Sequence, residues 1–212
     1  MTSLGQFAEV AYSSVPIALL IEHYATLNQP SYPLENYNAL RDCILVDTFL
    51  GNFADLPAYI AFRPSTRQLV VSISGTSSMK HAYQDLRAMR VAHPSGCGGV
   101  HAGFWDLYQG IRELLLTGIW KGFEQYSPAE IVLAGHSMGG SVAYLLSMDL
   151  LADKDAWRPN LTLRIATFGV PRSGDAKLVA HFRSLVDTFR KTWGDDSFHE
   201  YSVKGYNDGD YS

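Results

Sequence analysis

A serine stands at the centre of a pattern that is typical of nucleophilic catalysis. Residues 135–139 read GHSMG and fit G-x-S-x-G. In this pattern a serine hydroxyl is carried on a sharp turn between a strand and a helix. Gly135 and Gly139 leave room for such a turn because they have no side chain. The pattern therefore predicts a nucleophile elbow with Ser137 as its exposed hydroxyl.

The flanking sequence supports this interpretation. Ile131 to Ala134 is a short apolar run of the kind found in a parallel strand that is buried on both faces. Apolar residues then recur through an expected helix that extends to Leu151. A helix that begins at the elbow points its free N–H groups and the positive end of its dipole towards the hydroxyl, where negative charge would be favoured. The pentapeptide alone occurs often by chance, so this context carries the assignment.

A second informative place is the segment from Ser74 to Arg90. Gly75 and Thr76 leave an apolar run, and a short mixture of polar and apolar residues precedes a helical pattern at 83–89. A backbone N–H in such a loop could face a reaction centre. The same residues also suit an ordinary strand-to-helix loop, which is the more common case. From the residues alone both interpretations stay open.

Composition limits the class of protein. With 212 residues, 47% hydrophobic and 18% charged, we expect one globular domain over 1–212. A net charge of −4 argues against a nucleic-acid partner, and no apolar run is long enough for a transmembrane segment. The N-terminus lacks the basic and apolar regions of a signal peptide, which favours a cytoplasmic location, or a secreted one if that end is incomplete.

Cofactor and metal signals are weak. No spacing of histidine and carboxylate residues suggests a metal site, and the glycines around Cys97 are not followed by the G-K-[ST] of a phosphate loop. We therefore expect no cofactor. The two cysteines, Cys43 and Cys97, favour a reducing compartment and leave a single disulfide open.

The periodicity of apolar residues predicts alternating strands and helices, and hence a mostly parallel sheet flanked by helices. Expected helices cover 4–27 with a break before Pro16, 83–89, 104–123, the segment after Ser137, and 176–189. Expected strands cover 43–50, 58–62, 69–73, 131–134, 161–168 and 200–203.

Four motifs in order resemble one family. They are SGTSS at 74–78 with Asp85-Leu86 downstream, VHAGF at 100–104, GHSMGG at 135–140 and TFGVPRSGD at 167–175. Together they resemble the fungal-type class 3 lipases, which have the α/β-hydrolase fold. The resemblance implies a carboxylic-ester hydrolase with a serine, aspartate and histidine triad. It also implies a glycerolipid or similar ester as substrate and transient contact with a lipid interface.

Individual roles follow from the resemblance, residue by residue. Ser137 matches the nucleophile, and Met138 and Thr76 match the two residues whose backbone N–H groups form the oxyanion hole. Residues 77–83 match the lid of the family. Asp208, in VKGYND before a glycine, matches the triad aspartate. An aspartate in N-D-G is more often a turn former, so this last assignment rests on the resemblance.

The triad histidine departs from the family pattern. In the family it follows the aspartate by several dozen residues, whereas here four residues follow Asp208. None of the seven histidines occupies that place, and we expect His199 near the opposite end of the sheet. The expected structure is thus an α/β-hydrolase domain without its C-terminal elements, and residues 1–212 are expected to have little esterase activity.

Three hypotheses about function remain. The first is a serine ester hydrolase that works through an acyl-enzyme on Ser137. The second is a non-catalytic module that binds acyl esters, and the third is an acyltransferase on the same scaffold. The intact Ser137 and its two glycines favour the first.

Overall fold

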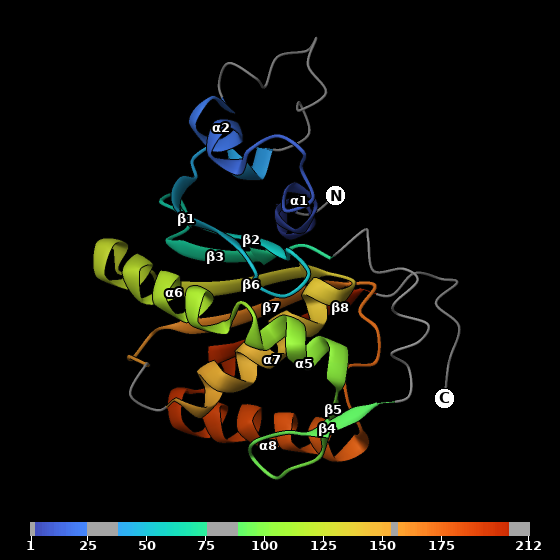
Figure 1. The fold of residues 1–212 in the computed structure, drawn as a ribbon. Coiled ribbons are helices and arrows are strands. Elements are labelled where there is room, and N and C mark those ends of the chain that lie inside the picture. The colour runs from blue at the N-terminus through green and yellow to red at the C-terminus, as the bar shows by residue number, and fades with distance from the viewer. Residues whose placement is uncertain (1–2, 25–37, 76–88, 154–156, 204–212) are drawn as a thin grey trace.

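A six-stranded sheet lies at the centre of the computed structural model, which describes residues 3–24, 38–75, 89–153 and 157–203 (Figure 1). Its strand order is β1-β2-β3-β6-β7-β8, and β4 and β5 form a separate hairpin. The strands are β1 (Ile44–Leu50), β2 (Pro57–Arg63), β3 (Gln68–Ile73), β4 (Arg90–Ala92), β5 (Gly99–His101), β6 (Glu130–His136), β7 (Thr162–Phe168) and β8 (Phe198–Val203).

Helices cover both faces of the sheet. In Figure 1 the two N-terminal helices lie above the sheet and the later helices lie below it. The α-helices are α1 (Ser3–Val10), α2 (Ile17–Glu22), α5 (Ala102–Gln109), α6 (Arg112–Tyr126), α7 (Met138–Ala152) and α8 (Ala176–Trp193), and short 3-10 helices are η1 (Asn38–Leu40) and η4 (Asp195–Ser197). This arrangement confirms the predicted α/β architecture.

The directions of the strands bring several chain exits to one edge. β1, β2 and β3 pair in antiparallel fashion, while β3, β6, β7 and β8 pair in parallel. The register places Ile73 beside Gly135, Gly135 beside Thr167, and Thr167 beside Ser202. The carboxyl ends of four strands therefore lie in one row, which is where ligands bind in open parallel sheets.

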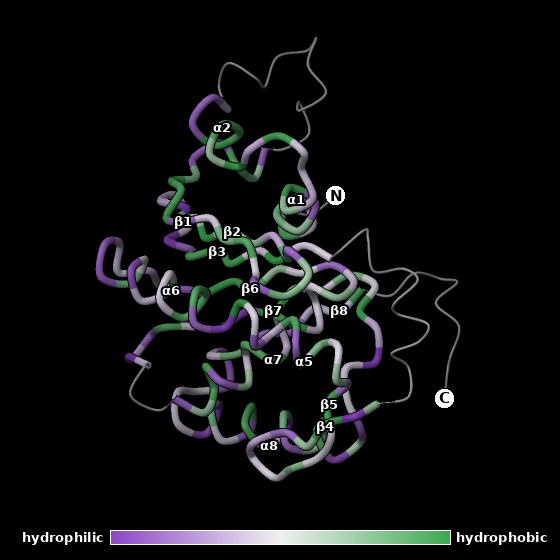
Figure 2. The backbone as a smooth tube through the Cα atoms, in the orientation of Figure 1, coloured by the Kyte–Doolittle hydropathy of each residue, from purple (hydrophilic) through white to green (hydrophobic). Residues whose placement is uncertain are grey.

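Two apolar layers enclose the sheet. Apolar residues, green in Figure 2, run along the central strands, and β6 is buried over all but its last residue. On one face Phe7 and Val10 of α1 pack with Val132 and Ala134 of β6. On the other face α5, α6, α7 and α8 bury the larger cluster. Such two-sided cover is what a continuous apolar run in a parallel strand requires.

Some predicted boundaries are wrong. The single helix expected over 104–123 is two helices, α5 and α6, which are separated at Gly110. The N–H of Asn52 donates to the Gly110 carbonyl at 3.0 Å, and a Cβ on Gly110 would lie 2.9 Å from Phe53. The loop after β1 thus packs against the break, and periodicity along one helix cannot show such a contact. β8 also begins two residues earlier than expected, at Phe198.

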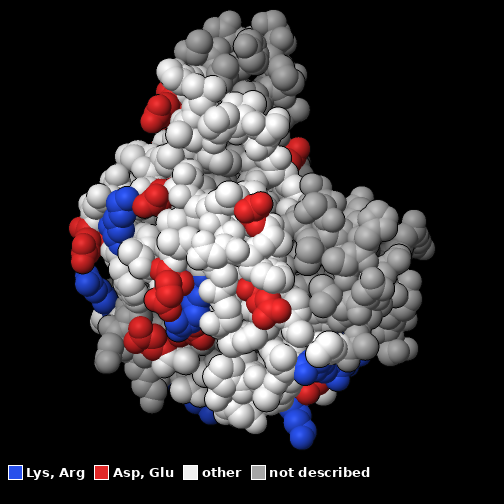
Figure 3. All heavy atoms as spheres, in the orientation of Figure 1, with Lys and Arg blue, Asp and Glu red and all other residues white. Residues whose placement is uncertain are grey.

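The surface and the cysteines add little chemistry. Figure 3 shows acidic and basic side chains dispersed over the visible face. No helix in the described ranges has both the length and the apolar character to cross a membrane. Cys43 and Cys97 are free thiols, the first buried and the second exposed. Burial raises the pKa of Cys43 to about 12, so it stays an unreactive thiol.

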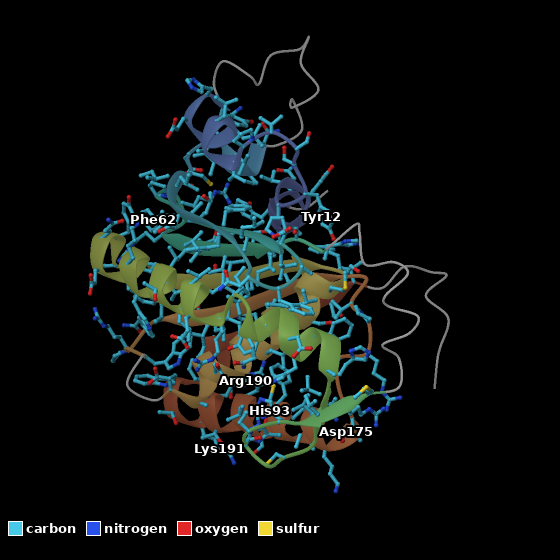
Figure 4. The ribbon with its side chains drawn as sticks, in the orientation of Figure 1. Tyr12, Phe62, His93, Asp175, Arg190 and Lys191 are labelled. Carbon is cyan, nitrogen blue, oxygen red and sulfur yellow. The ribbon has the colours of Figure 1, made fainter. Side chains whose placement is uncertain are left out.

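Asp175 joins the β4–β5 hairpin to α8. It is the N-cap of α8, and its carboxylate accepts the N–H of Leu178 and the N–H of Gly99, each at 2.9 Å. Figure 4 shows Asp175 at the start of α8, next to the hairpin. Together these two bonds hold the pKa of the Asp175 carboxyl below its ordinary value of 3.8, and the bond from Leu178 has the larger effect.

We expect Asp175→Ala to lower the melting temperature at neutral pH, because both N–H groups lose their acceptor. A depressed folded-state pKa contributes stability above the unfolded pKa, and this contribution disappears as the pH falls below about 3.8. The difference between wild type and variant should therefore shrink in acid, as measured by calorimetry from pH 7 to pH 3. Asp175→Asn keeps a capping oxygen without the charge, so its difference from wild type should be smaller at neutral pH and should also shrink in acid, while the difference between the two variants should be independent of pH. A pH-independent difference for Asp175→Ala would contradict the assignment.

Candidate active site

Ser137 is the turn residue of a strand-to-helix elbow. β6 ends one residue before it and α7 begins one residue after it, as the sequence predicted. Its backbone has φ 54° and ψ −126°, a conformation that residues with a side chain rarely adopt. The Ser137 N–H donates to the Phe168 carbonyl at 2.9 Å, and its carbonyl accepts the Gly140 N–H at 3.0 Å. These bonds hold the strained turn on both sides.

The two flanking glycines are required by close backbone packing. A Cβ on Gly135 would lie 2.6 Å from the Gly139 carbonyl oxygen. A Cβ on Gly139 would lie 2.3 Å from the carbonyl oxygen of Ile73 and 2.4 Å from that of Ser74. At these distances no side chain fits. The first turn of α7 therefore packs directly against the backbone of β6 and against the exit of β3.

The N-terminus of α7 supplies the electrostatics of the elbow. Met138 is the first residue of this helix and is buried. The first four N–H groups of an α-helix have no carbonyl partner within it, and the helix dipole adds positive potential there. Met138 lies at this end of the helix and directly follows Ser137 in the chain. Its place agrees with the predicted role as an oxyanion donor, which stays a prediction.

The exit of β3 lies beside the nucleophile. A Cβ on Gly75 would be 3.2 Å from the Ser137 Cβ and 3.1 Å from the His136 carbonyl oxygen. Gly75 is the residue directly before Thr76 in the sequence. The chain thus reaches the elbow one residue before the predicted oxyanion donor.

Several predicted features lie outside the described residues: Thr76, the lid segment 77–83, all but the last residue of the helix expected over 83–89, and Asp208. Their roles stay predictions. The end of β8 supports the last of them indirectly, because Val203 pairs with Phe168 at the same edge of the sheet as the elbow. Asp208 follows Val203 by five residues in the sequence.

Sequence reasoning missed Tyr12. This residue follows α1 (Figure 4), and its hydroxyl lies 2.7 Å from Nδ1 of His136. The two rings meet edge to face with centroids 5.4 Å apart. Partial burial raises the pKa of Tyr12 above its ordinary value of 10.0, against a smaller lowering by a hydrogen bond from the Gly75 backbone. The phenol therefore stays protonated at neutral pH. No motif or spacing marked Tyr12, because it comes from a segment distant in sequence.

The other described histidines lie away from the elbow. His199 pairs with Arg164, which pairs with Val132, five residues before Ser137 or roughly 17 Å along the sheet. The expected position of His199 near the opposite end of the sheet is thus confirmed. The rings of His93, in the β4–β5 hairpin, and His181, in α8, lie 6.1 Å apart and are tilted by 52° to each other. No cluster that could hold a metal ion occurs among the residues with described positions.

A surface hollow of about 240 Å³ lies between α8 and β8. Phe182, Arg190 and Glu200 are among its lining residues, and none of the predicted site residues lines it. The Glu200 carboxylate accepts a hydrogen bond from Tyr144. Because β8 runs at the edge of the sheet, this hollow is a feature of the open edge rather than of the elbow.

We expect Gly139→Ala to lower the free energy of unfolding by at least about 2 kcal/mol, since its Cβ would meet backbone atoms that cannot turn aside. Gly140→Ala is the matched control in the same helix turn. Its closest contact is a methyl group of the partly exposed Val170, and the cost should be about 1 kcal/mol or less. Urea unfolding midpoints measure both. Equal midpoints for the two variants would show that the elbow is not packed as described.

Comparison with known proteins agrees with this geometry. The chain is 27% identical over 183 residues to a lipase of Rhizomucor miehei, covering 81% of this chain and 50% of that protein. It is 26% identical over 148 residues to a secreted mono- and diacylglycerol lipase A of Penicillium cyclopium, covering 69% and 47%. The solved Rhizomucor miehei triacylglyceride lipase superposes with a TM-score of 0.67 at 25% identity, covering 86% of this chain and 66% of that one. The chain therefore spans about half the length of the curated relatives that it matches.

A family model described as Lipase (class 3) matches residues 70–203, which include most of β3, the elbow, β7 and β8. With the parallel sheet and a serine held at positive φ between β6 and α7, the match shows that this chain belongs to the class 3 lipase family and has its α/β-hydrolase fold.

Proposed function

We propose that this chain carries the nucleophile of a serine carboxylic-ester hydrolase of the lipase type, which cleaves acyl esters through an acyl-enzyme on Ser137. The observation that carries the proposal is the conformation of Ser137, at φ 54° between β6 and α7. Such a backbone costs about 1–3 kcal/mol and persists only where its surroundings enforce it. Binding an ester would not require this strain, whereas presenting a hydroxyl for attack does. The geometry therefore favours a hydrolase over a binding module.

The proposed reaction proceeds in two steps. The Ser137 Oγ attacks the ester carbonyl carbon while its proton passes to a base, and the carbonyl oxygen becomes an oxyanion. The N–H groups of Met138 and Thr76 stabilise that oxyanion. The C–O bond to the alcohol then breaks, and the base returns the proton to the departing alcohol. Water repeats the sequence on the acyl-serine and releases the acid.

Asp208 is the proposed acid of the triad, and its role is to orient an imidazole and stabilise its charge. We assign that imidazole to none of the described histidines, since His136 is bonded to Tyr12 and His199 lies at the other end of the sheet. The proposed substrates are glycerolipid or similar esters at a lipid interface. The relatives named as lipases and as mono- and diacylglycerol lipases support this choice.

A fluorophosphonate should form a covalent adduct on Ser137 during prolonged incubation, because its phosphorus mimics the attacked carbonyl and its oxygen the oxyanion, while the lack of an assigned base should make the adduct form slowly. Mass spectrometry of tryptic peptides locates the adduct. Ser137→Ala should abolish it, whereas Ser147→Ala, a serine of the same helix whose hydroxyl bonds the Tyr144 carbonyl, should leave it unchanged. Because no base is assigned, we expect residues 1–212 to hydrolyse nitrophenyl esters only about 10³–10⁴ times faster than water does. Absence of an adduct on the wild type would refute the proposed nucleophile.

Gly75→Ala should slow phosphonylation by about 10²–10³, the usual effect of losing one oxyanion donor. The added Cβ would lie 3.2 Å from the Ser137 Cβ and must push the loop away from the elbow. Gly51→Ala is the control at another strand exit, where the nearest atom is the Leu56 Cβ at 3.3 Å. If Gly75→Ala and Gly51→Ala are both labelled at the wild-type rate, the exit of β3 has no role in the reaction at Ser137.

A further inference from the structure

Tyr12 connects three segments that meet at the elbow. Its hydroxyl is bonded to Nδ1 of His136 at 2.7 Å and lies 3.4 Å from the His136 carbonyl oxygen. The same hydroxyl lies against Gly75, where an added Cβ would come within 2.2 Å of it. Tyr12 itself comes from the N-terminal helical segment, outside the residues that the family model matches. One phenol thus touches both the elbow and the exit of β3.

The contacts continue across the carboxyl edge of the sheet. On its other side the His136 ring faces Gly169, where an added Cβ would lie 3.6 Å from Nε2. The Gly169 N–H donates to the Val203 carbonyl at 2.8 Å. Tyr12, His136 and Gly169 therefore link the exits of β3, β6, β7 and β8 into one row of contacts.

We propose that Tyr12 and His136 are a positioning pair, which fixes the Gly75 backbone relative to Ser137 at the exit of β3. This inference rests on the proposed function of Ser137 and Thr76. Glycine is the residue with the most backbone freedom, so Gly75 does not hold its own conformation. An oxyanion donor must lie within about 0.5 Å of its productive place to be effective. The contact of the Tyr12 hydroxyl with Gly75 would hold the backbone in place at this point.

The Tyr12 hydroxyl is held between two groups. It lies against the Gly75 backbone, and its hydrogen bonds to Nδ1 and to the carbonyl oxygen of His136 tie it to the residue before Ser137. Tyr12 is itself held by buried neighbours, since Phe7 and Val10 of α1 pack on β6. The N-terminal layer thus has a role at the reaction edge beyond covering one face of the sheet.

The first experiment measures the interaction between Tyr12 and His136 directly and needs no enzymatic turnover. We compare the wild type with Tyr12→Phe, which keeps the ring packing and removes only the hydroxyl. The ¹⁵N signals of the His136 imidazole should show a hydrogen-bonded Nδ1 in the wild type and a changed Nδ1 shift in the variant. The Gly75 amide should exchange about two- to tenfold faster in the variant, the size of effect expected when one stabilising polar contact at the Gly75 backbone is lost. Unchanged imidazole signals and unchanged exchange would overturn the inference.

The second experiment measures how the Tyr12–His136 pair affects the reactivity of Ser137. Fluorophosphonate labelling of Ser137 should have a limiting rate at least tenfold lower in Tyr12→Phe, with an unchanged half-saturating concentration. His136→Asn keeps an acceptor oxygen near Nδ1 and should retain most of the rate, while His136→Leu should not. Tyr24→Phe is the control, because it removes a hydroxyl of the same N-terminal layer that bonds Asn38.

The outcomes separate the two proposals. If the wild type is not labelled, the proposed nucleophile fails, and the imidazole and exchange data still decide whether the pair holds Gly75. If the wild type and Tyr12→Phe are labelled at the same rate, the nucleophile stands and the positioning pair is refuted. Equal losses in Tyr12→Phe and Tyr24→Phe would indicate a general loosening of the N-terminal layer and would also refute it.

Discussion

The direct contact between backbones at the start of α7 is the constraint on which the rest of the arrangement depends. Gly135 and Gly139 let the first turn of the helix lie against β6 and against the carbonyl groups that end β3. A helix that starts so close to its own strand forces the residue between them into positive φ, and that residue is Ser137. Strain at the serine is thus a consequence of packing that could not occur with any side chain at the glycines.

Parallel pairing then decides what surrounds the serine. Because β3, β6, β7 and β8 end in one row, their exit loops meet at the elbow although they are far apart in sequence. The antiparallel strands β1 and β2 extend the sheet beyond β3, on the side away from β6. The α1 segment covers the opposite face from α7 and brings Tyr12 to the same edge. The local chemistry therefore draws on elements from both layers.

Two motifs of the family resemblance have a structural explanation. VHAGF and TFGVPRSGD contain no proposed catalytic residue, yet they are joined to each other in space. Val100 bridges Gly174, the His101 N–H donates to the Ser173 carbonyl, and Asp175 holds Gly99. This seam ties the β4–β5 hairpin to the start of α8. Together with the motifs at the elbow and at the exit of β3, it accounts for most of the pattern by which the chain resembles class 3 lipases.

The sequence alone determined the local part of this protein. The apolar run before the first glycine, the G-x-S-x-G turn and the helix after it are short-range features, and they predicted the elbow at Ser137 because each depends on neighbouring residues. The class of fold followed from alternating strand and helix patterns. Tertiary structure alone decided that Tyr12 reaches His136, since the two residues are 124 positions apart and no sequence motif contains both of them. It also decided that the helical pattern over 104–123 breaks at Gly110, because the cause is a loop from β1. Contacts of this kind depend on how the two helical layers close over the sheet, and periodicity along one segment carries no information about them.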